Sequence, residues 1–426
     1  MRQPFVAVVN LGCRVNRVES DRISCALAER GFALVDQRDA DVVVVNTCAV
    51  TAEAEAKTRK AVRHALSLPR EPLVVATGCV VNLHADELEQ LSDRVLCEPS
   101  KVDVPDRVAE ATGFSGASNG SANLELTELL GRHRIGVKVQ DGCDNRCTYC
   151  IVWKARGPSR SVPVDQVVDQ VDAVARAGVP EVVLTGVNLG RYDGSDEGDL
   201  HVELDELLTE ILDRTDVGHV RLSSIEPQDV TDRLLAAVRD SGGRVAPFFH
   251  MPLQSGCTAT LSRMGRAYTA DEYLDVVERV RAVLPEAAVS CDVIVGFPGE
   301  TDGEYDESRA LVERVGFSRL HVFRYSRRPG TWAADAPGQV SPEVMAERAR
   351  DLRELGEAMA LADRRRRVGR VERCVMEDGA HGTLASFHRV EVAPDEALAG
   401  RLVSVALDGV DADGGLVGHV VDGVRS

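Results

Sequence analysis

Three runs of hydrophobic residues near the start of the chain each end at a cysteine. The runs FVAVVNLGC, ADVVVVNTC and PLVVATGC end at Cys13, Cys48 and Cys79, and the helical stretches SDRISCALAERG and 52–68 lie between them. Nearly continuous Val-rich runs separated by helices are typical of a parallel α/β sheet, whose ligands bind beyond the carboxyl ends of the strands. One such cysteine would fit an ordinary buried thiol, but three in the same topological place predict a three-thiolate site.

A second alternation of strands and helices begins near residue 134. The candidate strands are IGVKVQ, EVVLTGV, HVRLSSI, PFFHMPL, AVSCDVIVGF and RLHVFRYS. The candidate helices between them lie near 164–177, 203–214, 229–240, 270–284 and 302–315, and a charged helix over 341–367 follows the last strand. Six β/α units are too few for a closed eightfold barrel and predict an open, partial one.

These patterns divide the chain into four parts and place it in the α/β class. We expect an N-terminal parallel α/β domain over 1–112, a linker over 113–133 and a partial (β/α)6 barrel core over 134–367. The linker contains the Gly/Ser/Asn-rich piece GFSGASNGSAN, which is typical of a flexible connection. Short alternating strands with glycine turns over 368–426, such as RLVSVALDGV, predict a small C-terminal β-barrel.

Composition limits the cellular setting and the partners. The 426 residues include 50 Lys and Arg against 68 Asp and Glu, a formal net charge of −18, which speaks against indiscriminate nucleic-acid binding. No segment approaches the long apolar run that a membrane span needs, so we expect a cytoplasmic protein. In that compartment the eleven cysteines predict thiols and metal ligands rather than structural disulfides.

The segment DGCDNRCTYC holds the most specific pattern in the chain. Cys143, Cys147 and Cys150 have the spacing C-x3-C-x2-C and follow the first barrel strand, at the face where barrels keep their chemistry. Iron–sulfur clusters are usually held by four thiolates, so three would leave one iron open to a cofactor. A structural zinc site is the alternative, but the nearest upstream histidine is His133 and no second C-x2-C pair follows.

The loop GCDNRCTYCIV resembles the signature of the radical S-adenosylmethionine (SAM) enzymes. The chain as a whole is similar to the methylthiotransferases, which combine an N-terminal three-cysteine domain, a partial barrel and a C-terminal TRAM domain. The other matching segments are NLGCRVN, NTCAVT, TGC, ARGPSRS, LTGVNLGRY, RLSSIEP, HMPLQSG, DVIVGFPGET and LHVFRYSRRPGT. They look most like the tRNA branch that modifies N6-threonylcarbamoyladenosine.

The resemblance implies two 4Fe–4S clusters and SAM as cofactors. Cys143, Cys147 and Cys150 would hold the cluster that binds and reductively cleaves SAM to a deoxyadenosyl radical. Cys13 with its two counterparts Cys48 and Cys79 would hold an auxiliary cluster that carries the methylated sulfur. The implied function is addition of a methylthio group to C2 of N6-threonylcarbamoyladenosine next to the anticodon of tRNA.

Further residues have plausible roles in binding SAM, each with an ordinary structural role as its alternative. Tyr149 would pack on the adenine or simply pack within its loop. The remaining candidates lie at the ends of barrel strands, where turns and helix entries explain them almost as well: Gly186 and Asn188 for the amino group, Ser224 and Glu226 for the ribose, and Gly296 for the adenine. We expect His250 to be a satisfied core histidine.

RNA contact has to come from local groups of arginine. The candidates are Arg156 and Arg160 after the cysteine loop, Arg324, Arg327 and Arg328 after the last barrel strand, and Arg364 to Arg367 with Arg370 and Arg373 before the tail. The tail from Val368 onward has five Arg and no Lys against ten Asp and Glu, although a TRAM domain is expected to grip RNA.

Three alternatives to this function remain open. They are methylthiolation of another tRNA adenosine, methylthiolation of a ribosomal-protein side chain, and a non-catalytic zinc-bearing RNA-binding protein. As partners we expect the tRNA anticodon loop and a reducing electron donor of the flavodoxin or ferredoxin type. The sequence does not identify the sulfur donor.

Overall fold

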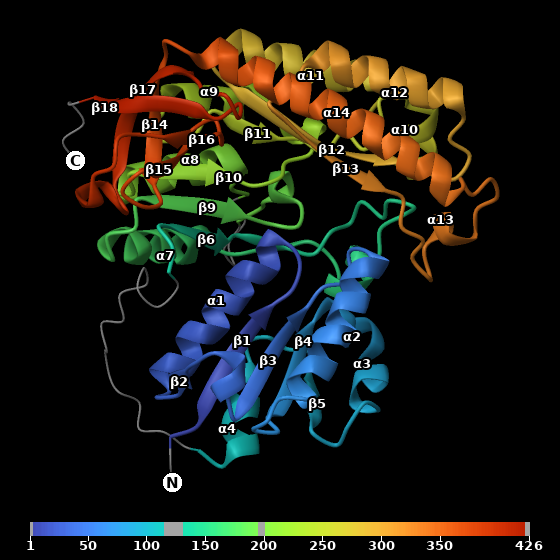
Figure 1. Cartoon of the computed structure of the whole chain (residues 1–426), viewed down its shortest axis with the longest axis vertical. Helices are drawn as coiled ribbons and strands as arrows, with labels where there is room; N and C mark the ends of the chain where they lie inside the picture. The colour runs from blue at the N-terminus through green and yellow to red at the C-terminus, as the bar shows by residue number, and fades with distance from the viewer. Residues whose placement is uncertain (1–2, 115–130, 195–200, 422–426) are drawn as a thin grey trace.

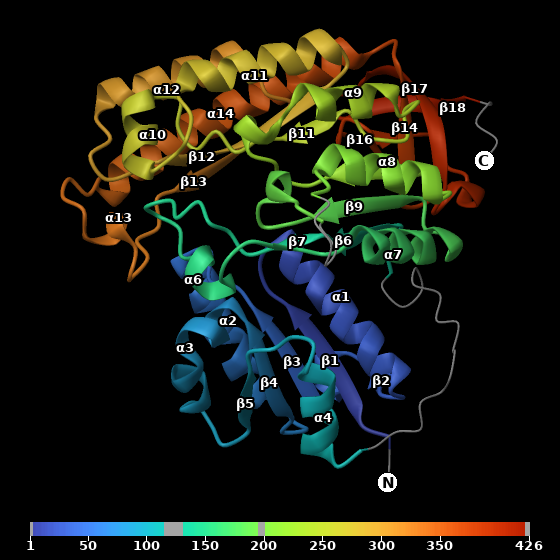
Figure 2. The ribbon, with the colours of Figure 1, turned by 180° about the vertical axis from the view of Figure 1, so that it is seen from behind.

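The computed structural model describes residues 3–114, 131–194 and 201–421. An N-terminal α/β domain lies against a partial barrel, and a small β-barrel adjoins the partial barrel (Figures 1 and 2). Most of the segment GFSGASNGSAN, which we expected to be a linker, falls outside the described residues.

The N-terminal domain is a five-stranded parallel sheet with the order β2-β1-β3-β4-β5. Its strands are β1 (Phe5–Asn10), β2 (Ala33–Leu34), β3 (Val42–Thr47), β4 (Leu73–Gly78) and β5 (Val95–Glu98). Alternate valines point to opposite faces, as strand geometry requires. Helices α1 (Arg14–Glu29) and α4 (Val104–Thr112) cover one face, and α2 (Ala52–Leu66) and α3 (Cys79–Glu89) cover the other.

Helix α1 begins six residues earlier than the hydrophobic pattern suggested. The pattern predicted a start at Ser20, whereas the helix begins at Arg14 and Cys13 is its N-cap. The buried face of its first turns includes Asn16 and Glu19, whose polar side chains concealed the helical period. The short strands β2 and β5 were also not expected.

The partial barrel has the six parallel strands that the sequence predicted. They are β6 (Arg134–Lys138), β9 (Glu181–Thr185), β10 (His219–Leu222), β11 (Phe248–His250), β12 (Ala288–Val295) and β13 (Arg319–Arg324). They form two three-stranded sheets, β6-β9-β10 and β11-β12-β13, joined by single bridges between Val220 and Val245 and between Ser224 and His250. No closing pair joins β6 to β13 within the described residues, so the barrel is open.

Helices surround the outside of the partial barrel. They are α7 (Val164–Arg176), α8 (Leu204–Arg214), α9 (Asp232–Asp240), α10 (Thr258–Met264), α11 (Ala270–Val283), α12 (Asp302–Val315), α13 (Trp332–Asp335) and α14 (Pro342–Arg367). Capping boxes at Thr269 and Thr301, each closed by a glutamate three residues later, fix the starts of α11 and α12. The short α10 and α13 were absent from the predicted set, as was the five-residue helix α6 (Val152–Arg156) after the cysteine loop, because they are too brief to show a period.

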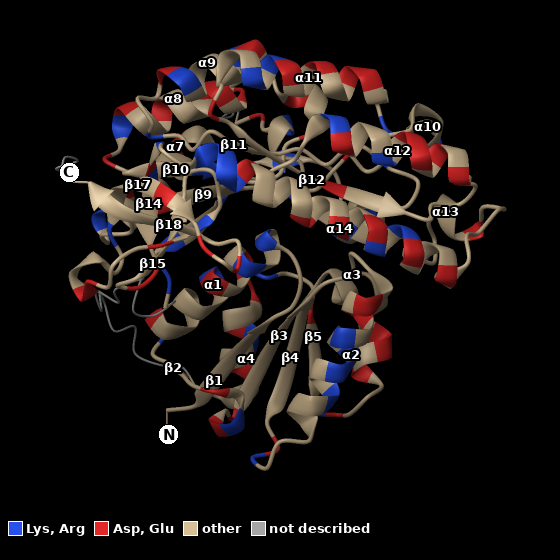
Figure 3. Ribbon diagram, turned by 45° about the horizontal axis from the view of Figure 1, so that its top comes forward, with Lys and Arg blue, Asp and Glu red and all other residues tan. Residues whose placement is uncertain are grey.

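The C-terminal domain is a closed five-stranded barrel, as predicted. Its strands, in the order β14-β15-β16-β18-β17, are β14 (Val371–Met376), β15 (His381–Leu384), β16 (Arg389–Glu391), β17 (Leu402–Val410) and β18 (Leu416–Val421). Acidic and basic residues alternate along the outer helices, whereas the strands β3 and β4 carry almost none (Figure 3). Among the described residues, no helix has the length and apolar character needed to cross a membrane.

Candidate functional site

The cysteine loop lies between β7 (Gln140–Asp141) and α6 (Val152–Arg156). We call Cys143, Cys147 and Cys150 the loop trio. Two hydrogen bonds fix the loop to the end of α10: the Thr148 amide donates to the Met264 carbonyl (3.0 Å) and its hydroxyl donates to the Arg263 carbonyl (2.8 Å). At the entrance, Gly142 has a φ of +74°, and a Cβ there would lie 1.8 Å from the Pro158 carbonyl oxygen. Only glycine fits this turn.

Thiolates of the loop trio need compensation for their charge. Burial raises the pKa of Cys150 to about 12 and also raises that of Cys143. The Val152 amide donates to Cys150 Sγ (3.4 Å), and Arg266 Nη1 donates to Cys147 Sγ (3.3 Å). Thiols that resist ionisation alone become thiolates when a metal binds, so this donor set fits an iron–sulfur cluster better than free reactive cysteines.

The spread of the sulfurs disfavours a zinc ion. Two thiolates on one zinc lie at most about 4.6 Å apart, because each Zn–S bond is about 2.3 Å. In the part of the chain that the structure describes, only His250, Asp292 and His321 bring three ligand atoms within 4.8 Å of one another. The loop trio is wider than a single zinc ion requires.

The second set of cysteines, Cys13, Cys48 and Cys79, follows the strands β1, β3 and β4, and we call it the sheet trio. The Cys48 thiol donates to Cys13 and, with the charge of Arg156, lowers the pKa of Cys13 to about 6. Gly12, at φ +104°, allows the chain to pass here, since a Cβ would lie 2.4 Å from Cys48 Sγ. Cys79 lies near enough to Cys48 for its charge to raise the pKa of Cys48. The parallel sheet has thus placed the three thiols at one edge.

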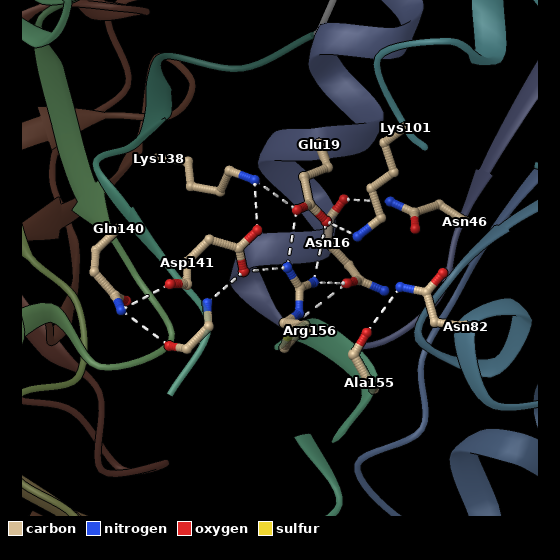
Figure 4. Close-up of polar contacts among 12 residues, drawn as sticks. Asn16, Glu19, Asn46, Asn82, Lys101, Lys138, Gln140, Asp141, Ala155 and Arg156 are labelled. Carbon is tan, nitrogen blue, oxygen red and sulfur yellow. Dashed lines mark hydrogen bonds and ion pairs between the residues drawn. The ribbon is translucent and has the colours of Figure 1, made fainter. Parts of the chain in front are cut away.

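A buried network of charges joins the two trios. We call Asn16, Glu19, Lys101, Lys138, Asp141 and Arg156 the Arg156 network (Figure 4). Arg156, at the end of α6, donates to Glu19 (2.9 and 3.1 Å), to Asp141 (2.9 Å) and to Asn16 (2.6 Å). Asn16 in turn donates to the carbonyl oxygens of Leu11 (2.9 Å) and Thr47 (2.7 Å), each close before a cysteine of the sheet trio.

The charged side chains of the Arg156 network are buried and therefore need partners of opposite charge. The side chains of Glu19 and Arg156 are each 4% exposed. Burial alone would raise the pKa of Glu19, but the hydrogen bonds and charge of Arg156, helped by Lys101 and Lys138, lower it to about 2. The network therefore holds the α1 end of the N-terminal domain against the start of the barrel as a set of ionised groups.

Three arginines that we expected to contact RNA are buried and occupied elsewhere. Arg156 belongs to the network just described, Arg328 pairs with Glu55 of α2, and Arg367 pairs with Asp363 and Glu372. The side chains of Arg328 and Arg367 are 3% exposed. For these three residues the prediction of RNA contact is wrong, because a sequence shows a positive charge but not its buried partner.

The structure places the predicted SAM-binding residues near the loop trio to different degrees. Glu226 pairs with Arg266, the same arginine that donates to Cys147. Tyr149 packs beside Met264, Phe297 and Tyr325, with its ring centroid 6.3 Å from that of Phe297. Arg266 was not identified from the sequence, since a single arginine in MGRAY has no spacing that marks it.

The other predicted positions are explained in part by packing. The backbone amide of Asn188 donates to Gln140 Oε1 (2.8 Å), while the buried side-chain Oδ1 of Asn188 has no partner within the described residues. A Cβ at Gly186 would lie 2.9 Å from Gln140 Oε1, and one at Gly296 would lie 2.1 Å from Met345 Cγ of α14. The backbones of Ser224 and His250 form a single parallel β-bridge. A role of these residues in binding SAM stays a prediction.

Comparison with known proteins gives matches along most of the chain. Residues 137–312 match the radical SAM superfamily, and residues 5–97 match a family described as uncharacterized protein family UPF0004. Among solved structures, the radical S-adenosylmethionine methyltransferase TsrM from Kitasatospora setae aligns with a TM-score of 0.57 over 78% of this chain and 75% of that one, at 16% identity. That likeness concerns the fold.

Curated relatives are closer in sequence. Threonylcarbamoyladenosine tRNA methylthiotransferase MtaB of Thermotoga maritima is 35% identical over 87% of this chain and 86% of its own length. The protein of the same name from Chlamydia pneumoniae is 32% identical over 97% of both chains. The tRNA-2-methylthio-N(6)-dimethylallyladenosine synthase of Novosphingobium aromaticivorans is 33% identical over 87% and 86%. This chain is therefore a transferase that belongs to the radical SAM tRNA methylthiotransferase family.

Proposed function

We propose that this enzyme adds a methylthio group to C2 of N6-threonylcarbamoyladenosine next to the anticodon of tRNA. The observation that carries the proposal is the pairing of two cysteine trios, one in the barrel loop and one at the sheet edge, across the Arg156 network. Several relatives at 31–35% identity bear the name of the threonylcarbamoyladenosine enzyme.

Membership of the family implies a 4Fe–4S cluster and SAM. When bound, they supply a one-electron cleavage of SAM that generates a radical able to attack an unactivated carbon. We assign this cluster to the loop trio and a second 4Fe–4S cluster to the sheet trio. In this assignment Arg266 stabilises the charge on Cys147, and Gly12 keeps Cys48 close to Cys13.

The proposal extends to the parts of the chain and to the partners. We assign 1–112 to the auxiliary-cluster domain, 113–133 to the linker, 134–367 to the radical SAM core and 368–426 to the TRAM-like domain. The substrate is the anticodon loop of a tRNA in the cytoplasm, and the electron comes from a flavodoxin- or ferredoxin-type donor. RNA contact then depends on the exposed Arg160, Arg327 and Arg366, which have exposed side-chain fractions of 57%, 65% and 56%.

A second candidate substrate comes from the Novosphingobium relative, whose name refers to dimethylallyladenosine. The deciding experiment is mass spectrometry of tRNA nucleosides from cells lacking the gene, with and without a plasmid copy. We expect loss of the methylthio form of threonylcarbamoyladenosine and its return with the plasmid. Loss of the methylthio-dimethylallyl form instead would reassign the substrate, and unchanged nucleosides would contradict both assignments.

The clusters are tested separately. Anaerobic reconstitution should give a brown protein with iron and sulfide for two clusters. A colourless protein that retains zinc would favour the non-catalytic alternative.

A further inference from the structure

A cavity of about 230 Å³ lies inside the partial barrel, between α1 and the strands β6, β9 and β10. Its lining is unusually basic for a protein with a net charge of −18. The charged residues that line it are Arg14, Arg17, Arg132, Arg134, Arg221 and Glu377. The remaining lining is small or apolar and includes Gly136, Val183 and Phe387. A concave site with converging positive groups is an arrangement that binds anions.

Phe387 lies at the end of this cavity and gathers arginines from four separate elements. It comes from the turn between β15 and β16 of the C-terminal domain, has a φ of +68°, and stacks on Phe248 of β11 with ring centroids 4.9 Å apart. The guanidinium carbons around its ring belong to Arg221 (5.0 Å), Arg14 (5.3 Å), Arg319 (5.5 Å) and Arg134 (5.7 Å). The C-terminal domain thereby contributes to the partial barrel an aromatic ring that is surrounded by four arginine side chains.

These four arginines differ in their partners. Arg221 is fully buried, pairs with Glu181 (3.0 Å) and donates to the carbonyl oxygens of Leu384 and Ala385. Arg134 pairs with Glu377 (2.6 Å). Within the described residues, neither Arg14 nor Arg319 makes an ion pair, and water reaches both.

Arg14 and Arg319, which we call the interior arginine pair, therefore have no ion-pair partner among the described residues. Arg14 lines this cavity, and Arg319 lines a neighbouring cavity that Phe387 also borders. The guanidinium groups of Arg221, Arg319 and Arg134 surround the same Phe387 ring as that of Arg14, so these positive charges repel one another. Such mutual repulsion is relieved by an anion between the two guanidinium groups. An anionic ligand would gain charge-assisted hydrogen bonds that neither arginine side chain makes with the described part of the chain.

Besides Glu377, which pairs with Arg134, the carboxylate of Asp292 acts on Arg14 but makes no ion pair with either arginine of the pair. Asp292 lies 3.3 Å from His250 Nε2, and its oxygen, His250 and His321 form the three-ligand group within 4.8 Å described above. The charge of Arg14 acts on both Asp292 and His321, and that of Arg319 acts on His321, so both arginines would repel a metal ion held there. The charge of the interior thus favours an anion over a cation.

We propose that the interior arginine pair binds the carboxylate of the threonyl group carried by the substrate base, an inference that rests on the proposed function. A threonylcarbamoyl group is joined through the threonine nitrogen, which leaves the carboxylate free, whereas a dimethylallyl group carries no charge. Arg14 directly follows Cys13, which places it next to the sheet trio, to which we assign the cluster that carries the methylated sulfur. The pair would then determine which modified adenosine is accepted.

The test compares three anticodon stem-loop RNAs that differ only at N6: the threonylcarbamoyl acid, its methyl ester and the dimethylallyl form. Each is given to reconstituted wild-type enzyme and to the variants Arg14→Gln, Arg319→Gln and Arg239→Gln. Arg239 is an exposed arginine on α9, outside the cavity and outside the groups assigned to RNA, and serves as the matched control for loss of one charge. The readouts are kcat/KM for the methylthio product and the rate of SAM cleavage.

We expect wild type to prefer the acid over the ester, and each variant of the interior arginine pair to lose on the order of 10- to 100-fold on the acid alone. Turnover of the ester should stay constant, which shows that the variant is folded and holds its clusters. Arg14→Gln can disturb Cys13, which is its neighbour in the sequence. Arg319→Gln still tests the pair in that case, because Arg319 is not adjacent to any cysteine of either trio.

Three results would overturn the inference. Equal losses on all RNAs would assign the pair to a backbone phosphate, and variants that keep the acid preference would remove the pair from recognition. Wild type that accepts acid and ester equally would also refute it while leaving the proposed function intact. Wild type that converts only the dimethylallyl RNA would instead refute the proposed function itself.

Discussion

The loop trio and the sheet trio bring three thiols together by different means. The loop trio lies in one segment, and its shape depends on local hydrogen bonds and on two contacts with α10. The sheet trio follows three different strands and meets only because β1, β3 and β4 are neighbours in a parallel sheet. A spacing pattern reveals the first kind of site, whereas topology is needed for the second.

The difference extends to what each trio depends on. Asn16 connects the strand ends next to Cys13 and Cys48 to Arg156, which comes from the other domain. The sheet trio is thus coupled to the contact between domains, while the loop trio is anchored within the barrel core. Changes at this contact should affect the two sites unequally.

The largest effect should come from removing one thiol of each trio. We expect Cys147→Ala to abolish both SAM cleavage and product, and Cys48→Ala to abolish product while SAM cleavage continues. Each variant should lose about half of the iron of the reconstituted protein. The control Cys25→Ala, at a half-buried thiol on α1, should change neither readout. Loss of SAM cleavage in Cys48→Ala would show that the two assignments are wrong.

Next in size is the loss of the charge that connects the trios. Arg156→Gln leaves Glu19 and Asp141 buried without their main partner, so we expect the free energy of unfolding to fall by about 3–5 kcal/mol. Arg160→Gln removes an exposed partner of the same Asp141 and should cost only about 0–1 kcal/mol. Urea denaturation measures both.

Iron analysis of Arg156→Gln sharpens the comparison further. We expect iron to be lost preferentially from the sheet trio, so that SAM cleavage outlasts methylthio transfer. Equal loss of both activities would mean that the loop trio depends on the same contact.

Acid should weaken the same contact. The pKa of Glu19 is about 2 in the folded protein and about 4.3 when unfolded, so its contribution of about 3 kcal/mol is fully present above pH 4.5 and is lost as the pH falls toward 2. Urea denaturation between pH 5 and 2.5 should show a shallower pH dependence for Glu19→Gln than for wild type. Identical slopes would contradict the role of Glu19.

Much of this organisation was accessible from the sequence, and the exceptions have physical causes. The Val-rich strands and the barrel helices were predicted because their periods are regular and their faces apolar. The start of α1 was missed because Asn16 and Glu19 are buried although they are polar, and polar residues in a sequence indicate an exposed position. Arg156 was misassigned to RNA because its partner Glu19 is 137 positions away, and no local pattern reports such a pairing.

The smallest effect should come from substituting Arg266, which contacts the loop trio and should change only the electrostatics of that site. Arg266 donates to Cys147 Sγ (3.3 Å), and hydrogen bonds to cluster sulfurs tune the reduction potential. We expect Arg266→Gln to lower the potential of the loop-trio cluster and to slow SAM cleavage by about 10- to 100-fold, with Arg266→Lys partly restoring both. Arg263→Gln is the matched control, because its guanidinium pairs with Glu304 instead. A redox titration followed by electron paramagnetic resonance should find the sheet-trio cluster unchanged in all three variants, and a shift of both potentials would show that the clusters do not respond independently.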